Sequence, residues 1–256
     1  MTDTVSLIAL SDVPLVRPGD DLSALLAAAI ERRIAKLLTA GDVLVVAQKI
    51  VSKAEGRYVD LARVEPGAEA QRLAAETEKD PRLVQVILDE SRRVVRHRPG
   101  VLIVEHRLGF VMANAGIDRS NIDPAIGTEP VLLLPHNPDA SANTLRQQLA
   151  THFGLAPAVI VSDSFGRAWR RGTTGIALGA AGLPALMDLR GRPDLYGRAL
   201  RVTESGFADE IAAAASLLMG QADEAIPAVL VRGLVWSAPT EPADRLIRPA
   251  EEDLFR

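Results

Sequence analysis

The chain has 256 residues and a formal net charge of −4 at pH 7. Its residues are 48% hydrophobic and 24% charged, which is typical of a soluble globular protein. The absence of a basic excess argues against a general nucleic-acid or membrane-surface role, and the absence of cysteine excludes thiolate catalysis, disulfides and Cys-ligated metals. The N-terminus lacks the pattern of a signal peptide, and no segment approaches about 18 consecutive apolar residues. We therefore expect a cytoplasmic protein without a membrane span.

Helical and strand-like patterns alternate along the first half of the chain. Residues 21–38 are rich in Ala and Leu at helical spacing, and residues 42–53 contain the unbroken run VLVVA, which suits a strand buried on both faces. A helix over 82–96 is favoured by Asp80 as its cap and Pro81 at its first position. The remaining elements expected here are a helix at 68–79, a hairpin of 101–105 with 108–114, and a strand at 131–135.

The second half continues the alternation. A helix over 141–153 ends at Gly154, and the apolar segment 157–163 predicts a buried strand that ends at Asp163. The pattern is completed by the segment 198–204, an Ala-rich helix around 207–219 and the strand-like segment 227–234. Mixed helices, strands and hairpins predict an α/β fold in the broad sense, including mixed α+β. We expect residues 1–236 to form one domain and the polar, Pro-broken residues 237–256 to form a peripheral tail.

Two segments carry side chains suited to chemistry. NAGIDRSNID (114–123) contains Asp118, Asn121 and Asp123, and VSDSFGRAWRRGTTGIALG (161–179) begins with Asp163 and Ser164. Carboxylate, amide and hydroxyl oxygens are the ligands that Mg²⁺ and Mn²⁺ prefer, so an Asp from each loop predicts part of a metal site. Three arginines at 167, 170 and 171 suit phosphate or carboxylate, and the following GTTG, read as a turn, offers backbone N–H groups to an anion.

Simpler interpretations stay open for each of these features. An Asp at a strand end more often caps a helix or forms a turn, closely spaced arginines also form a solvated surface, and Lys53 could extend from a strand edge into solvent. Neither a GxxxxGK[ST] phosphate loop nor a GxGxxG fingerprint is present. The residues alone therefore indicate an α/β enzyme that depends on metal and phosphate. The alternatives are a metal-dependent phosphohydrolase of a small phosphoester and a non-catalytic protein that binds a phosphorylated metabolite.

A series of longer motifs runs through most of the chain. These motifs are VPLV (13–16), GDVLVVAQKIVSKAEGR (41–57), ETEKDPRLVQVILDES (76–91), MANAGIDRSNID (112–123), VSDSFGRAWRRGTTGIALGAAGLPAL (161–186) and MGQADEAIPAVLVRG (219–233). In content and order they resemble the coenzyme F420-0:L-glutamate ligase family, also called F420 gamma-glutamyl ligases. The resemblance implies an enzyme that joins L-glutamate to F420-0 with GTP, through an acyl phosphate, and that forms an intertwined homodimer. It further implies two divalent cations per site, Mg²⁺ or Mn²⁺, with K⁺ as an additional candidate.

The same resemblance implies roles for individual residues. The expected metal ligands are Asp118, Asp163, Ser164 and Gln221. The expected nucleotide contacts are Val13, Pro14, Leu15, Val16, Gln48, Lys53, Asn121, Met219, Gly220, Gln221, Ala222, Asp223, Glu224, Ala225 and Ile226. Gln48 stands where the family pattern has Ser, which sets it apart from the other matched positions. The charge of GTP, the substrate carboxylate and glutamate leads us to expect that Arg167 and Arg170 assist Asp118 and Asp163 in catalysis.

Overall fold

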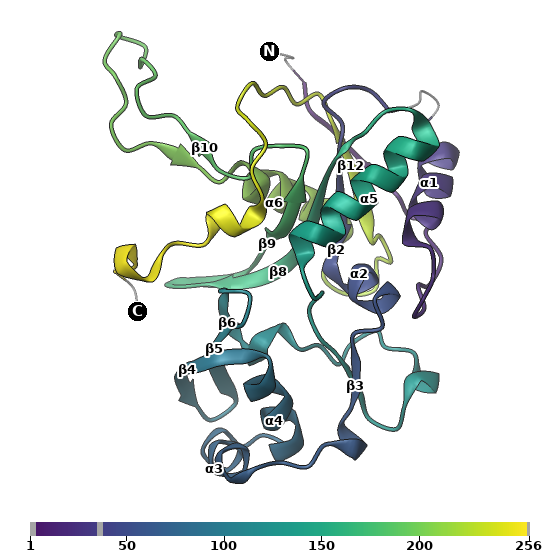
Figure 1. Cartoon of the computed structure of the whole chain (residues 1–256), viewed down its shortest axis with the longest axis vertical. Coiled ribbons are helices and arrows are strands. Elements are labelled where there is room, and N and C mark those ends of the chain that lie inside the picture. Colours follow the sequence, from purple (N-terminus) through teal and green to yellow (C-terminus); the bar gives the residue numbers. More distant parts are fainter. Residues whose placement is uncertain (1–3, 35–37, 255–256) are drawn as a thin grey trace.

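A five-stranded mixed sheet forms the centre of the molecule (Figure 1). The computed structural model describes residues 4–34 and 38–254. The strand order is β1-β12-β2-β8-β9, and only β2 and β8 run parallel to each other. The strands are β1 (Ser6–Ala9), β2 (Val43–Ala47), β8 (Ala158–Arg167), β9 (Arg170–Ala181) and β12 (Ala228–Arg232).

Helices cover both faces of this sheet. Leu44 and Val46 of β2 face one apolar core, and Val43 and Val45 face the other, as the period of two in a strand requires. The first core also contains residues of α1 (Leu22–Arg33), α2 (Gln48–Ala54) and α5 (Pro138–Phe153), and the second contains residues of α6 (Phe207–Met219). The VLVVA run is therefore buried on both sides, as its composition predicts.

A smaller lobe is inserted between α2 and α5, below the main sheet in Figure 1. Its helices pack on a three-stranded antiparallel sheet of order β4-β5-β6, and a separate two-stranded ribbon, β3 with β7, connects it to the main sheet. Its elements are β3 (Tyr58–Asp60), η1 (Leu61–Arg63), α3 (Ala68–Thr77), α4 (Pro81–Asp89), β4 (Ser91–Arg98), β5 (Val101–His106), β6 (Val111–Ala113), η2 (Asn114–Gly116), η3 (Pro124–Ile126) and β7 (Pro130–Leu132).

Two further features lie at the periphery. Residues 187–205 form an arm that projects from the main sheet, closed at its base by β10 (Met187–Asp188) and β11 (Glu204–Ser205) (Figure 1). The C-terminal segment contains η4 (Ala243–Leu246) and η5 (Ala250–Glu252). The backbone N–H of buried Ala243 donates to the Asp139 carboxylate at the start of α5, which ties this segment to the main sheet. The division of the chain at residue 236 stays a prediction.

The α/β fold class is confirmed, and so are the helices expected near 68–79, 141–153 and 207–219 and the hairpin of β5 with β6. The helix expected over 21–38 is present as α1, and residues 35–37 of that prediction lie outside the described residues. Along the described parts of the chain, no helix is both long and apolar enough to cross a bilayer.

Four expectations about local structure are wrong. The strand expected to end at Asp163 continues to Arg167 as β8, because its outer part pairs with β9. The strand expected over 42–53 ends at Ala47, and the chain turns directly into α2. The helix expected over 82–96 ends at Asp89, because the following segment pairs with β5 as strand β4, with Val94 opposite Val104. The GTTG segment is no turn: it lies within β9, where Thr173 and Thr174 pair with Gly166 and Phe165 of β8. In each case, pairing or packing with distant segments overrides the local pattern.

Glu90, at the end of α4, contacts three basic side chains of the segment between α2 and α5. Its carboxylate accepts hydrogen bonds from Arg57 Nη2 at 2.9 Å and Arg107 Nε at 3.0 Å, and His106 Nε2 lies 3.4 Å away. Arg57 Nε also donates to the Leu134 carbonyl. Burial alone would raise the pKa of Glu90, but these partners lower it to about 2. The ionised carboxylate is therefore strongly preferred in the folded protein.

We expect Glu90→Gln to lower the free energy of unfolding by about 2 kcal/mol at pH 7, because a carboxylate pKa depressed below its ordinary ~4.3 stabilises the folded state wherever that group is ionised. The stabilisation is complete above about pH 5 and is lost as the pH falls toward 2. Denaturant unfolding at several pH values should show the difference between the two proteins shrinking below pH ~4. The exposed Glu78→Gln serves as control, and a pH-independent difference for Glu90→Gln would contradict this account.

Candidate functional site

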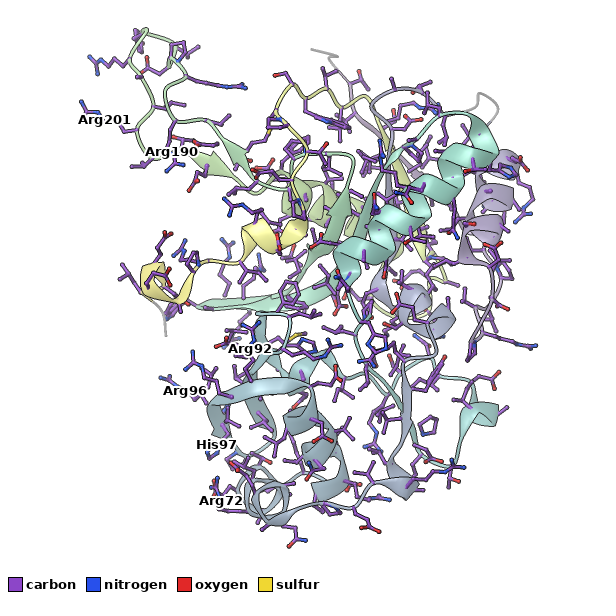
Figure 2. The ribbon with its side chains drawn as sticks, viewed as in Figure 1. Arg72, Arg92, Arg96, His97, Arg190 and Arg201 are labelled. Atoms are coloured by element: carbon purple, nitrogen blue, oxygen red, sulfur yellow. The ribbon has the colours of Figure 1, made fainter. Side chains whose placement is uncertain are left out.

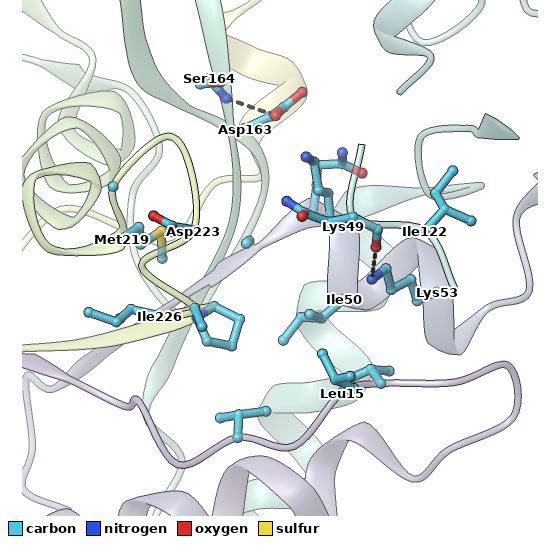
Figure 3. Close-up of a pocket in the computed structure, with 18 of the residues that line it drawn as sticks. Leu15, Lys49, Ile50, Lys53, Ile122, Asp163, Ser164, Met219, Asp223 and Ile226 are labelled. Carbon is cyan, nitrogen blue, oxygen red and sulfur yellow. Dashed lines mark hydrogen bonds between the residues drawn. The ribbon is translucent and has the colours of Figure 1, made fainter. Parts of the chain in front are cut away.

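A cavity of about 690 Å³ opens where β2 ends beside the middle of β8 and the loops of the smaller lobe approach these strands. Figure 3 shows Asp163 and Ser164 on one side, Lys49, Lys53 and Ile122 on another, and Met219, Asp223 and Ile226 on a third, with Leu15 at the bottom of the view. Segments far apart in the sequence therefore line one space. Its mixture of apolar and polar side chains is typical of a small-molecule site.

The parallel pairing of β2 with β8 positions Asp163. Ala47 at the end of β2 lies opposite Ser162, so Asp163 follows at the point where α2 begins. Burial raises the pKa of the Asp163 carboxyl to about 7; the Ser164 N–H at 2.8 Å opposes this rise and the charge of Asp118 adds to it. Asp163 and Asp118 are therefore close enough to interact. A desolvated carboxyl beside a second carboxylate is fully ionised only when a cation lies nearby.

Asp118 reaches the site from the loop between β6 and β7. Its backbone forms paired hydrogen bonds with Leu132, which fix its position beside β7. One carboxylate oxygen accepts from the Ser120 N–H at 2.6 Å, and the other lies 2.6 Å from Lys49 Nζ. Burial would raise the pKa of Asp118, but Lys49 and Ser120 keep it below its ordinary value. Asp118 does not itself line the cavity, whereas Lys49 does.

Three residues expected on the nucleotide side come together at α2. Gln48 is buried and accepts a hydrogen bond from Ser52 Oγ at 2.9 Å, and Lys53 Nζ donates to the Asn121 carbonyl at 2.6 Å. Burial and the charge of Lys49 lower the pKa of Lys53, while Asp118 and Asp123 oppose that effect. Lys53 is thus bound across the cavity wall and does not extend into solvent. Gln48, Lys53 and Asn121 all line the cavity.

The remaining nucleotide-side residues lie on two loops. Val13, Pro14, Leu15 and Val16 line the cavity, with Val16 buried and Leu15 exposed. The loop between α6 and β12 lines it through Met219, Gly220, Gln221, Ala222, Asp223, Ala225 and Ile226. Glu224 of the same loop is not among the lining residues; its carboxylate accepts from the Ala222 N–H at 2.8 Å and holds the loop in shape.

The arginines lie away from the cavity lining. Arg167 and Arg170 face each other at the tip of the β8–β9 hairpin, and Arg167 Nη2 donates to the Arg171 carbonyl. The hairpin explains why they are distant: an antiparallel ladder, with a register shift between Gly166 and Arg167, carries the chain outward from Asp163. Gly175, the last residue of GTTG, does line the cavity. The catalytic role expected for Arg167 and Arg170 stays a prediction.

The donor set fits a hard divalent cation. Within residues 4–34 and 38–254, no group of three or more His, Cys, Asp and Glu side chains is arranged to hold a metal ion. Asp118 and Asp163 nevertheless interact, Ser164 adds a hydroxyl, and Gln221 adds an amide oxygen on the opposite loop, 3.4 Å from Thr173 Oγ1. Mg²⁺ and Mn²⁺ prefer such oxygens, and with few protein carboxylates they complete their coordination with water and phosphate oxygens.

Lys49 and Ser162 are among the lining residues to which the sequence had assigned no role. Lys49 ion-pairs with Asp118, and Ser162 lies in the buried part of β8 with its hydroxyl 3.9 Å from Met219 Sδ. The signal for Lys49 was its spacing of four residues from Lys53, which places both lysines on one face of a helix. That signal was hidden because the segment was expected to be a strand.

Comparison with known proteins identifies relatives along nearly the whole chain. The profile of the family F420-0:Gamma-glutamyl ligase matches residues 11–233. Proteins named coenzyme F420:L-glutamate ligase are similar to this chain: that of Methanothermobacter thermautotrophicus is 45% identical over 98% of this chain and 99% of its own length. Those of Methanopyrus kandleri and Archaeoglobus fulgidus are 46% and 41% identical over 95% and 98% of this chain, and 96% of their own lengths in both cases. The chain therefore belongs to the F420-0:gamma-glutamyl ligase family.

Proposed function

We propose that this protein joins L-glutamate to coenzyme F420-0 through an amide bond, with GTP as the source of the phosphoryl group. Family membership makes it an enzyme of the ligase class that acts on small molecules. The observation that carries the finer proposal is the cavity lined by Asp163, Lys49 and Lys53, with Asp118 held by its ion pair to Lys49. Carboxylates that can hold a cation, beside ammonium groups that can face phosphate, are the parts that phosphoryl transfer needs.

In the proposed reaction, a carboxylate oxygen of F420-0 attacks the γ-phosphorus of GTP, giving an acyl phosphate and GDP. The amine of glutamate then attacks the acyl carbon, phosphate leaves, and an amide forms. Asp118, Asp163, Ser164 and Gln221 would hold Mg²⁺ or Mn²⁺, two per site, with K⁺ as an additional candidate; the bound cations would neutralise charge on the phosphates. This chain's own residues orient the three anionic reactants, since Lys53 and Asn121 fix one wall of the cavity and residues 219–226 another.

We further infer that the protein acts as a homodimer, and the arm of residues 187–205 supports this. Leu195 is 100% exposed, and Tyr196 and Val202 are nearly as exposed. Apolar side chains gathered on one exposed surface are typical of a site that contacts another molecule. Main-chain hydrogen bonds such as those between Arg192 and Leu200 keep the arm extended. Arg190 and Arg201 on the arm lie on the same side of the view as Arg92 and Arg96 of β4 (Figure 2). A second copy would cover the apolar tip of the arm.

We expect F420-0 incubated with the protein, GTP, L-glutamate and Mn²⁺ to gain mass in glutamyl units, and to gain none without GTP, because the carboxylate needs activation before an amine can displace its oxygen. Mass spectrometry of the deazaflavin product is the measurement. Unchanged F420-0 in a folded, metal-replete sample would refute the ligase proposal. GTP hydrolysis that does not require glutamate would instead favour a phosphohydrolase, and binding without turnover a non-catalytic binding protein.

Asp118→Asn and Asp163→Asn should each lower turnover by about 10²-fold or more, because positioned phosphoryl transfer tolerates little displacement. If both carboxylates serve one metal site, the double variant should be little worse than the worse single variant. Turnover and Mn²⁺ dependence are measured with melting temperature as a check on folding. The exposed Asp89→Asn, remote from the cavity, is the matched control. Near-normal turnover in either single variant would remove that residue from the metal site.

Light scattering at micromolar concentration should give a mass of twice 27.3 kDa for the protein and a lower mass for Leu195→Ser/Tyr196→Ser, because the double substitution removes the apolar tip of the arm. Leu254→Ser, which also changes an exposed leucine, should leave the mass unaltered. A monomer mass for the unmodified protein would contradict the dimer, and a dimer mass for the arm variant would exclude the arm as its main contact.

A further inference from the structure

The ammonium of Lys49 holds the Asp118 carboxylate. It lies 2.6 Å from Asp118 Oδ2 and 2.7 Å from Ser120 Oγ, while Asp118 Oδ1 accepts from the Ser120 N–H at 2.6 Å. Both oxygens of this carboxylate therefore have a donor of the protein itself. A cation that binds Oδ2 must share it with Lys49 or displace Lys49, and a cation that binds Oδ1 is repelled by the same ammonium.

Lys49 also belongs to the wall of the cavity. It is one of the lining residues, whereas Asp118, its ion-pair partner, is not. The ammonium that holds Asp118 is therefore on a residue that a ligand in the cavity can contact.

Two cations at one carboxylate oxygen repel each other, and this repulsion is weakly screened where the groups are partly buried. The side chains of Lys49 and Asp118 are 30% and 26% exposed. A partly exposed lysine has a long, flexible stem and can move without unfolding its helix. Lys49 can therefore leave Asp118 when a stronger cation is present, and its ammonium then remains inside the cavity.

We propose that Lys49 is an internal counterion: it holds Asp118 while the site is empty, yields it to the divalent cation, and then contacts a phosphate of the nucleotide. The inference rests on the proposed function, because it assumes that Asp118 is a metal ligand. Lys49 then has two successive partners, Asp118 and a phosphate. In the empty site its contact with Asp118 keeps that loop in place, and in the loaded site its ammonium adds positive charge where the phosphates bind.

Lys53 provides an internal comparison. It lies one helical turn further along α2 and links the same two segments, but its ammonium donates to the backbone carbonyl of Asn121 at 2.6 Å (Figure 3). Its removal takes one positive charge from the neighbourhood without freeing the Asp118 carboxylate. If Lys49 formed only an ordinary surface ion pair, its removal should have no more effect on metal affinity than that of Lys53.

The test measures Mn²⁺ binding to the full-length protein in the absence of nucleotide, by electron paramagnetic resonance of free Mn²⁺. Lys49→Met should bind Mn²⁺ about three- to tenfold more tightly than the unmodified protein, the range expected when a competing ion pair is removed. Lys53→Met should change the affinity less than about twofold. With Mn²⁺ saturating, Lys49→Met should bind GDP more weakly by about threefold or more, because a phosphate partner is lost.

Unchanged or weaker Mn²⁺ binding by folded Lys49→Met, or an equal gain in Lys53→Met, would overturn the counterion proposal, and so would unaltered GDP affinity. Asp118→Asn separates this failure from a failure of the metal site. If Asp118→Asn loses Mn²⁺ binding while Lys49→Met gains none, only the role of Lys49 is wrong. If Asp118→Asn binds Mn²⁺ as the unmodified protein does, Asp118 is not a metal ligand, and the counterion role of Lys49 fails with it.

Discussion

The parallel pairing of β2 with β8 is the constraint on which the site depends. β2 ends at Ala47, which lies opposite Ser162 in the middle of β8, and this register places the start of α2 beside Asp163. A shift by one residue would turn every side chain of β2 to the other face and exchange the two apolar cores. Because Leu44 and Val46 fill one core and Val43 and Val45 the other, packing on both faces fixes the register to which the chemistry is attached.

The smaller lobe completes the site from outside the sheet, and two sets of polar contacts fix its position and its internal structure. Lys49 and Lys53 reach from α2 to the loop that carries Asp118. Within the lobe, Glu90 receives Arg57 and Arg107. Both sets join residues distant in the sequence, so the position of Asp118 relative to Asp163 is a product of tertiary structure. Neither local propensity nor the sheet alone determines it.

The sequence predicts those features whose cause is local. The apolar run of β2, the capping of α4 by Asp80 and the left-handed Gly154 after α5 each follow from short-range rules, and the structure has all three. The segments QKIVSK and SRRVVR were misread because β-branched and charged residues occur in both helices and strands, and distant partners decide between them. The oxygen ligands could be proposed from composition and family motifs. The ion pair of Lys49 with Asp118 could not, because it joins residues whose proximity only the fold creates.

The two halves of the β8–β9 hairpin depend on different interactions. The outer half is held by backbone pairing from Ser164 opposite Gly175 to Arg167 opposite Arg170, and most side chains near the tip are exposed. Backbone hydrogen bonds tolerate many side chains at exposed positions. Exchanging exposed side chains at the tip should therefore leave the backbone of the hairpin, and with it the register of Asp163 beside β2, in place, so that an engineered protein can carry a new tip on an unchanged scaffold.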